Sequence, residues 1–187
     1  LKRDPDRYWI LDPIDGTTNF TQGIPFWGPS LALWDRGGPV CGWIHFPALG
    51  QMYRASRGGG AFLDGEPIRT SGVKEYSDLC SVATASRTHR RLRLTCPAKH
   101  RILGSIIANL AYLATGTFAA VYCRAAIWDM AAGLLIAREA GAVLDCDPAI
   151  ETLDPGAVDP ARTTAITVHG TANAELPSFR RFLVDCA

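Results

Sequence analysis

Residues 12–20 read Asp12-Pro13-Ile14-Asp15-Gly16-Thr17-Thr18-Asn19-Phe20, and the expected fold and chemistry both follow from this stretch. It comes directly after an apolar run, residues 8–11, that predicts a short buried strand. Two carboxylates therefore stand where a strand gives way to a turn, which the Pro and Gly favour. The two threonines supply hydroxyl and backbone N–H groups at an expected helix start. Hard oxygen donors beside free N–H groups suit a divalent cation that carries a phosphate.

A third carboxylate lies far downstream, in Trp128-Asp129-Met130-Ala131-Ala132-Gly133. Asp129 precedes a pattern typical of a helix over residues 130–140, which is rich in Ala and Leu and is followed by Gly141. Taken separately, Asp-Pro and Asp-Gly pairs are common turn formers, and an Asp at a helix start is most often a cap. The combination of the two segments favours one shared site over these structural readings.

Together the two segments resemble the inositol monophosphatase family of magnesium-dependent, lithium-sensitive phosphatases. The family pattern is Asp-Pro-Ile/Leu-Asp-Gly-Thr followed by Trp-Asp-x-Ala-Ala-Gly, and both runs stand here without substitution at their key positions. Three further segments are similar to family features, namely a Gly-rich hairpin, a helix start on the phosphate side, and a helix end with the strand that follows it. These segments are residues 58–65, 104–112 and 139–143.

Haloacid-dehalogenase-like phosphatases are the competing family, because they also place an Asp pair before Gly-Thr near the N-terminus. Their pair is separated by one residue, which puts both side chains on the same side of an extended strand. Here Pro13 and Ile14 intervene, and that family has no counterpart of the segment around Asp129. This spacing favours the inositol monophosphatase family.

The resemblance implies a mixed α/β fold, the layered α/β/α/β/α sandwich of the inositol monophosphatase and fructose-1,6-bisphosphatase type. We expect a single catalytic domain over residues 1–187. An antiparallel meander with the first motif is expected over residues 1–78, and a mixed α/β half with the second motif over residues 79–187. In that second half, helices are expected at 105–114, 129–140 and 174–184, strands at 118–123, 142–144 and 164–168, and a loop at 145–162.

Relatives in this family carry helices before the first motif, with a Gly-Glu-Glu run whose Glu completes the metal site. No Glu precedes Asp12 in this chain. We therefore expect the N-terminal helices to be missing and the 187-residue form, taken alone, to be nearly inactive.

Composition indicates an ordinary globular protein of 187 residues, with 48% hydrophobic residues and a net charge of +1. This charge balance gives no reason to expect a nucleic acid or an anionic membrane as a partner. The six cysteines form no C-x-x-C pair, so we expect free thiols in a reducing compartment rather than a zinc site. No signal peptide and no membrane-spanning run are seen. These observations predict a cytoplasmic protein, and the resemblance adds a homodimer.

The resemblance also assigns roles to residues, with about two or three Mg²⁺ ions as cofactor. Asp12 would bridge two ions, the Ile14 carbonyl would join the first, and Asp15 and Asp129 would complete the second. Thr17 would orient the attacking water, so Thr17, Asp12 and Asp15 are the expected catalytic group. The phosphate and substrate contacts are expected from Gly16, Thr17, Ser105, Ile106, Tyr122, Arg124 and Asp129.

The sequence indicates the substrate less directly than it indicates the metal ligands. The ending Thr18-Asn19-Phe20 resembles the inositol monophosphatase branch, so inositol monophosphate is the first expectation. Histidinol phosphate, fructose 1,6-bisphosphate and 3′-phosphoadenosine 5′-phosphate are the alternatives. Many members of that branch have a Glu seven residues before the second-motif Asp, whereas Tyr122 stands there in this chain, with Arg124, Ser86 and Arg87 as further candidates. A binding or regulatory protein that is catalytically incomplete is the alternative of another class.

Overall fold

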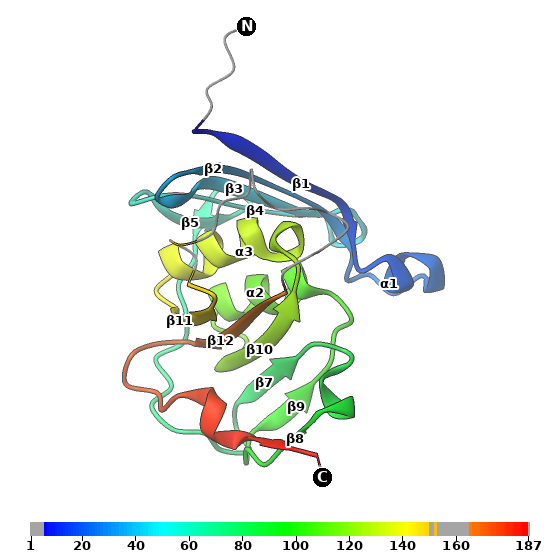
Figure 1. Ribbon diagram of the computed structural model, residues 1–187, viewed down its shortest axis with the longest axis vertical. Coiled ribbons are helices and arrows are strands. Elements are labelled where there is room, and N and C mark those ends of the chain that lie inside the picture. The colour runs from blue at the N-terminus through cyan, green and yellow to red at the C-terminus, as the bar shows by residue number, and fades with distance from the viewer. Residues whose placement is uncertain (1–5, 150–151, 153–164, 187) are drawn as a thin grey trace, which may run out of the picture.

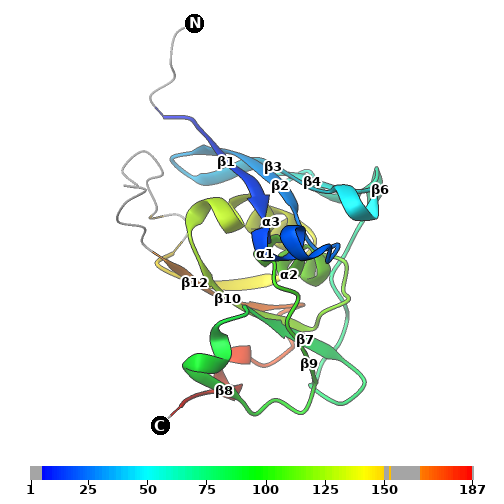
Figure 2. The same ribbon diagram turned by 90° about the vertical axis from the view of Figure 1, so that its right-hand side faces the viewer.

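The structure is a computed structural model that describes residues 6–149, 152 and 165–186, and its elements form layers around two packed helices (Figures 1 and 2). An antiparallel sheet lies on one side of these helices and a mixed sheet lies on the other. The layered arrangement of α and β elements expected from the sequence is confirmed.

The first sheet is an antiparallel meander whose six strands are neighbours in sequence order, as predicted. Buried and more exposed residues alternate along its strands, because one face packs on the helices and the other faces outward. The strands are β1 (Tyr8–Asp15), β2 (Gly28–Asp35), β3 (Gly38–Phe46), β4 (Gln51–Ser56), β5 (Gly60–Leu63) and β6 (Glu66–Pro67).

The second sheet has the strand order β11-β12-β10-β7-β9. In it, β10 runs parallel to β7 and β7 runs parallel to β9, whereas β12 is antiparallel to both of its neighbours. Its strands are β7 (Ser81–Thr84), β9 (Lys99–Arg101), β10 (Ala120–Ala125), β11 (Val143–Asp147) and β12 (Ile166–Thr171). A small third sheet pairs β8 (Leu92–Leu94) with β13 (Leu183–Asp185).

Two helices, α2 (Ile106–Ala114) and α3 (Ile127–Glu139), lie between the sheets and supply a large share of the core. Small residues let them pack closely: a Cβ on Gly133 would lie 2.7 Å from Cδ1 of Leu110 in α2. A Cβ on Gly42 in β3 would likewise lie 3.0 Å from Cα of Ala132. This close packing fixes the start of α3 relative to the first sheet. The described residues also include the helix α1 (Thr17–Gln22) and the 3₁₀ turns η1 (Pro47–Leu49), η2 (Thr88–Arg90) and η6 (Phe179–Phe182).

The helix predicted at residues 174–184 is wrong, because the structure has the 3₁₀ turn η6 and the strand β13 there. The amide oxygen of Asn173 accepts the N–H groups of Glu175 and Leu176 and so forms a local turn. Pro177 has no N–H to donate to a helix, and its carbonyl accepts the hydroxyl of Tyr76.

Other predicted boundaries are shifted. The helix predicted at 129–140 begins at Ile127, and the loop predicted from residue 145 begins later, because β11 continues to Asp147. The rest of that predicted loop lies mostly outside the described residues. The helix predicted at 105–114 is confirmed, with Ser105 as its N-cap. Among the described residues, no helix combines the length and the apolar character needed to cross a membrane.

Candidate metal and phosphate site

The first motif continues β1 instead of ending it, so the expected strand end at Leu11 is wrong. The pairing of β1 with β2 shifts register between Asp12 and Asp15, as in a β-bulge. Residues three apart on a regular strand point to opposite faces. The irregularity instead lets both carboxylates turn inward, and each residue is only 8% exposed.

Gly16 ends this strand in the left-handed conformation, with φ at 75°, and serves as the N-cap of α1. A Cβ at this position would lie 2.6 Å from the carbonyl oxygen of Phe26, so both the backbone angle and the available space require glycine. The buried Asn19 anchors α1, because its Nδ2 donates to the carbonyls of Phe26 (2.7 Å) and Leu103 (2.8 Å). The motif therefore holds a tight turn against the loop that precedes α2.

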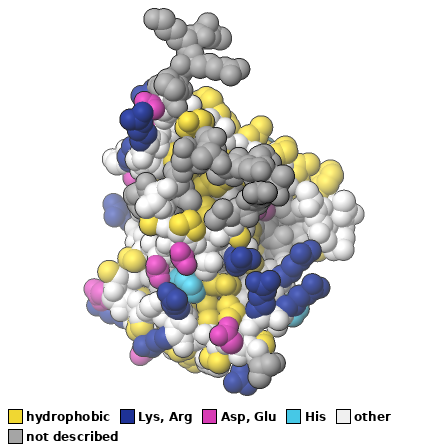
Figure 3. All heavy atoms as spheres, in the orientation of Figure 1, with side chains coloured by type: hydrophobic (Ala, Val, Ile, Leu, Met, Phe, Trp, Pro, Cys, Tyr) yellow, Lys and Arg dark blue, Asp and Glu magenta, His cyan; other side chains and the backbone are white. Residues whose placement is uncertain are grey.

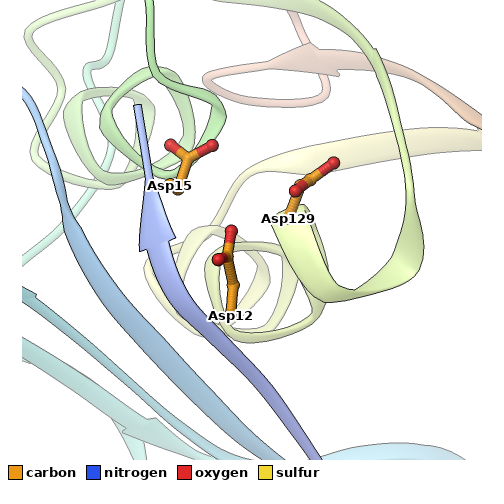
Figure 4. A group of neighbouring side chains, drawn as sticks. All are labelled: Asp12, Asp15 and Asp129. Atoms are coloured by element: carbon orange, nitrogen blue, oxygen red, sulfur yellow. The ribbon is translucent and has the colours of Figure 1, made fainter. Parts of the chain in front are cut away.

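The third carboxylate comes from α3, which starts directly after β10. Asp129 is the third residue of the helix, and its Oδ2 accepts the N–H of the N-cap residue Ala126 at 3.0 Å. Oxygen atoms of Asp12, Asp15 and Asp129 all lie within 4.8 Å of one another (Figure 4). The prediction that these three residues converge is confirmed.

This spacing fits one divalent cation after small side-chain rotations. Two oxygens bound to the same Mg²⁺ lie at most about 4.2 Å apart, twice the usual metal–oxygen distance. The donors are hard anionic oxygens, which Mg²⁺ prefers. The three carboxylates are therefore a donor set that can hold a metal ion.

The raised pKa values of the three carboxyl groups also favour a bound cation. Burial raises the pKa of Asp15 to about 6, with a further contribution from the negative charge of Asp12. Burial also raises the pKa of Asp129 to about 6, helped by the charges of both other carboxylates, and it raises the pKa of Asp12. Two buried carboxylates and one half-buried carboxylate, close together without a counterion, hold protons more tightly, and a bound cation would reverse this.

Groups at the start of α2 donate hydrogen bonds to the carboxylate of Asp15. The hydroxyl of Ser105 donates to Oδ2 of Asp15 and accepts the N–H of Ala108 at 3.1 Å, while the N–H of Ile107 donates to the same Oδ2 at 3.2 Å. From the sequence, Ser105 and Ile106 are expected to bind phosphate. The hydrogen bond from Ser105 to the carboxylate of Asp15 was not predicted. A Ser at the start of an apolar helix is a visible signal of a cap, but no sequence pattern shows which carboxylate lies beside it.

The remaining residues predicted around the first motif lie close to the carboxylates. The N–H of Ile14 donates to Oδ1 of Asp12 at 3.0 Å. Gly16 is half-buried, and Thr17 is exposed as the first residue of α1. Thr17 is therefore accessible and follows Asp15 by two residues in the chain.

Tyr122 and Arg124 belong to a different part of the surface. Val121 and Cys123 of β10 pack on the helix side of the second sheet, whereas Tyr122 packs on the opposite side, with its ring centroid 5.0 Å from that of His169. Arg124 is exposed at the end of β10. Both line a cavity that also includes Arg87 and contains none of the three carboxylates.

Comparison with known proteins gives a consistent result. The model of the inositol monophosphatase family matches residues 1–176. The inositol-1-monophosphatase of Mesorhizobium japonicum is 38% identical over 167 residues, which cover 83% of this chain and 63% of that protein. The fructose-1,6-bisphosphatase/inositol-1-monophosphatase of Thermotoga maritima is 40% identical over 150 residues, which cover 74% of this chain and 56% of that protein.

A solved structure has the same fold. The extragenic suppressor protein suhB from Bartonella henselae superposes with a TM-score of 0.73 at 32% identity, over 92% of this chain and 70% of that one. The chain spans 54–63% of the length of the curated relatives it matches.

Proposed function

The chain belongs to the inositol monophosphatase family, and we propose that it hydrolyses small phosphomonoesters with the help of Mg²⁺. The observation that carries the proposal is the meeting of Asp12, Asp15 and Asp129, from segments more than a hundred residues apart, within 4.8 Å. Such a cluster of carboxylates, two buried and one half-buried, is costly unless a cation neutralises it. The motif with Gly16 and Thr17 places backbone N–H groups beside it, where a phosphate can bind.

In this proposal, Asp12, Asp15 and Asp129 hold the metal, with the Ile14 carbonyl as a further donor. About two or three Mg²⁺ ions bound there would activate a water molecule and neutralise charge on the phosphoryl group. This requirement for Mg²⁺ also predicts inhibition by Li⁺, as the family resemblance implies.

Residues of the chain position the attacking water, the phosphate and the metal ligand Asp15. Thr17 orients the attacking water through its accessible hydroxyl, and the N–H groups of Gly16 and Thr17 bind phosphate oxygens. Ser105 and the N–H of Ile107 fix the rotamer of Asp15. The N–H of Ile106 remains a proposed phosphate contact.

Inositol monophosphate is the first proposed substrate, because of the ending of the first motif. Histidinol phosphate, fructose 1,6-bisphosphate and 3′-phosphoadenosine 5′-phosphate are the alternatives. A homodimer in the cytoplasm, without nucleic-acid or membrane partners, completes the proposal. A catalytically incomplete binding or regulatory protein on the same fold is the second candidate.

Phosphate release tests this function. The protein in its natural full length is assayed against the four substrates with Mg²⁺, with Mg²⁺ plus Li⁺, and after metal removal. We expect release only with Mg²⁺, inhibition by Li⁺, and a loss of about two to four orders of magnitude in rate for Asp129→Asn. Asp78→Asn, an exposed Asp outside the site, is the matched control. Full activity in metal-free protein would contradict the mechanism, and magnesium binding without any release would favour the binding protein.

A further inference from the structure

Four arginines line one cavity of about 370 Å³ at the edge of the second sheet. They are Arg87, Arg90, Arg91 and Arg124, and Tyr122 forms part of the wall. The rest of the lining is neutral, and no carboxylate belongs to it. The cavity therefore concentrates positive charge in a concave site with an aromatic side.

These arginines have no acidic partner among the residues that the structure describes. The ion pairs found there use Arg36, Arg57 and Lys74 instead. Figure 3 shows Lys and Arg side chains gathered on this face of the molecule, below its middle on the right. Guanidinium groups bind phosphate and carboxylate in a forked geometry, so an anion is the ligand that this lining favours.

A second cavity, of about 350 Å³, is also lined by Leu92 and Tyr122, but negatively charged side chains predominate in its lining. Its lining holds three carboxylates, Asp145, Asp147 and Asp185, against one guanidinium group, that of Arg180. An anion is therefore favoured on the arginine side of Tyr122 and disfavoured on the other side. Burial raises the pKa of Tyr122 although the charges of Arg124 and Arg91 oppose this, so its hydroxyl stays a neutral donor at pH 7.

The arginine-lined cavity opens at the carboxyl ends of two neighbouring parallel strands. β7 and β10 are held together here by the N–H of Ala85, which donates to the carbonyl of Tyr122 at 3.0 Å. Arg87 follows β7, and Arg124 lies at the end of β10. In open α/β sheets, ligands bind outside the carboxyl ends of the strands.

The same edge leads directly to the three carboxylates. From Arg124 the chain enters α3, whose third residue is Asp129. Arg124 and Asp129 are five residues apart in the chain, of which two are extended and three are helical. Their Cα atoms therefore lie at most about 12 Å apart. A single small molecule can therefore reach from the carboxylates to the arginines.

We infer that the arginine-lined cavity binds a second anionic group of the substrate, so that the chain acts on phosphomonoesters carrying a further phosphate or carboxylate. This inference rests on the proposed function and narrows its substrate class. It favours bisphosphates and phosphorylated acids over phosphates of neutral polyols, and so ranks fructose 1,6-bisphosphate above inositol monophosphate, the substrate that the ending of the first motif favours. The arginines take no part in the chemical step and select the substrate by charge.

A matched pair of substrates tests the inference. Phosphate release is measured with fructose 1-phosphate and fructose 1,6-bisphosphate, which differ by one phosphate, and with 3-phosphoglycerate for the carboxylate case. We expect the double variant Arg87→Gln/Arg124→Gln to lower the preference for bisphosphate over monophosphate, as a ratio of kcat/KM, at least tenfold, mainly through KM. Arg93→Gln, in the same basic segment but outside the lining, is expected to keep the ratio within twofold. An unchanged ratio in the double variant would overturn the inference.

Binding without turnover separates this inference from the proposed function. Calorimetry measures the Kd of fructose 1,6-bisphosphate for metal-free protein prepared by dialysis, for the wild type, the double variant and Arg93→Gln. We expect at least tenfold weaker binding in the double variant alone. If no substrate is hydrolysed but this difference persists, the phosphatase proposal fails and the anion site stands. Equal Kd values in all three proteins would overturn the anion site whatever the activity.

Discussion

At the scale of single residues, the burial of Asp15 makes the stability of the metal-free protein depend on pH. Its pKa is 3.8 in the unfolded chain and about 6 in the folded one, so the folded state binds more protons between these values. The stabilising contribution is complete below about pH 4 and is lost as the pH rises through about 6. Asp129 adds to the same trend.

We therefore expect the melting temperature of metal-free protein to fall between pH 4 and 7, and the fall to be smaller in Asp15→Asn. Saturating Mg²⁺ should raise the melting temperature at pH 7, because the cation binds the ionised carboxylates of the folded state. Thermal unfolding with and without metal measures both effects. A melting temperature that rises with pH without metal would show that the carboxylates are not buried as described.

Ser105 is the residue that connects a helix cap to the site. Ser105→Ala removes the cap of α2 and a donor to the buried Asp15, so we expect a loss of about 1–3 kcal/mol in the free energy of unfolding. Magnesium binding should weaken as well. Ser178→Ala is the control, since that serine is exposed and caps η6 with no side-chain hydrogen bond. Denaturant unfolding and calorimetric titration report the two effects, and equal values for both variants would refute the role of Ser105.

At the scale of elements, the contact between α2 and α3 leaves no room for a side chain at Gly133. Gly133→Ala places a methyl group 2.7 Å from Cδ1 of Leu110, and we expect a loss of about 1–3 kcal/mol from overpacking. Gly72→Ala is the matched control, because a Cβ there meets nothing within 4 Å. Chemical denaturation measures both, and an unchanged or higher stability of Gly133→Ala would contradict the tight packing.

The elements also show which features the sequence could predict. The meander and α2 followed from hydrophobic patterns and turn residues, which are local signals. The inward turn of both Asp12 and Asp15 depends on a register shift against β2, which is a tertiary effect. The helix predicted over residues 174–184 failed because the side chain of Asn173 and the contact between Pro177 and Tyr76 outweigh helical propensity.

At the scale of the whole molecule, the outer face of the first sheet carries apolar side chains. Trp9 and Leu11 are 61% and 57% exposed, and the ring centroids of Trp9 and Trp43 lie 6.2 Å apart. Contiguous exposed apolar surface promotes association. We expect Trp9→Glu/Leu11→Lys to lower the self-association of the 187-residue chain in analytical ultracentrifugation. Leu79→Lys, an isolated residue that is 90% exposed, should have no such effect. Equal association of both variants would show that this face is not involved.

Sequence motifs identified the three carboxylates because each lies in a run with a specific neighbourhood. They did not show that Tyr122 packs on the side of the second sheet opposite the helices, next to a cavity that Arg124 also lines, since only the pairing of β10 with β7 and β12 fixes that orientation. The motifs thus predicted that the three carboxylates converge, whereas the roles of Tyr122 and Arg124 as substrate contacts stay predictions.

The central claim is that Asp12, Asp15 and Asp129 hold a divalent cation. Crystals of this chain grown with Mn²⁺ in place of Mg²⁺, measured just above the manganese absorption edge, test it directly, because manganese scatters anomalously there far more strongly than the sulfur atoms of Cys and Met. We predict an anomalous peak within about 2.5 Å of carboxylate oxygens from all three residues, and its loss in Asp129→Asn crystals. A map with manganese bound elsewhere, or with no peak among the three carboxylates at saturating Mn²⁺, would contradict the account.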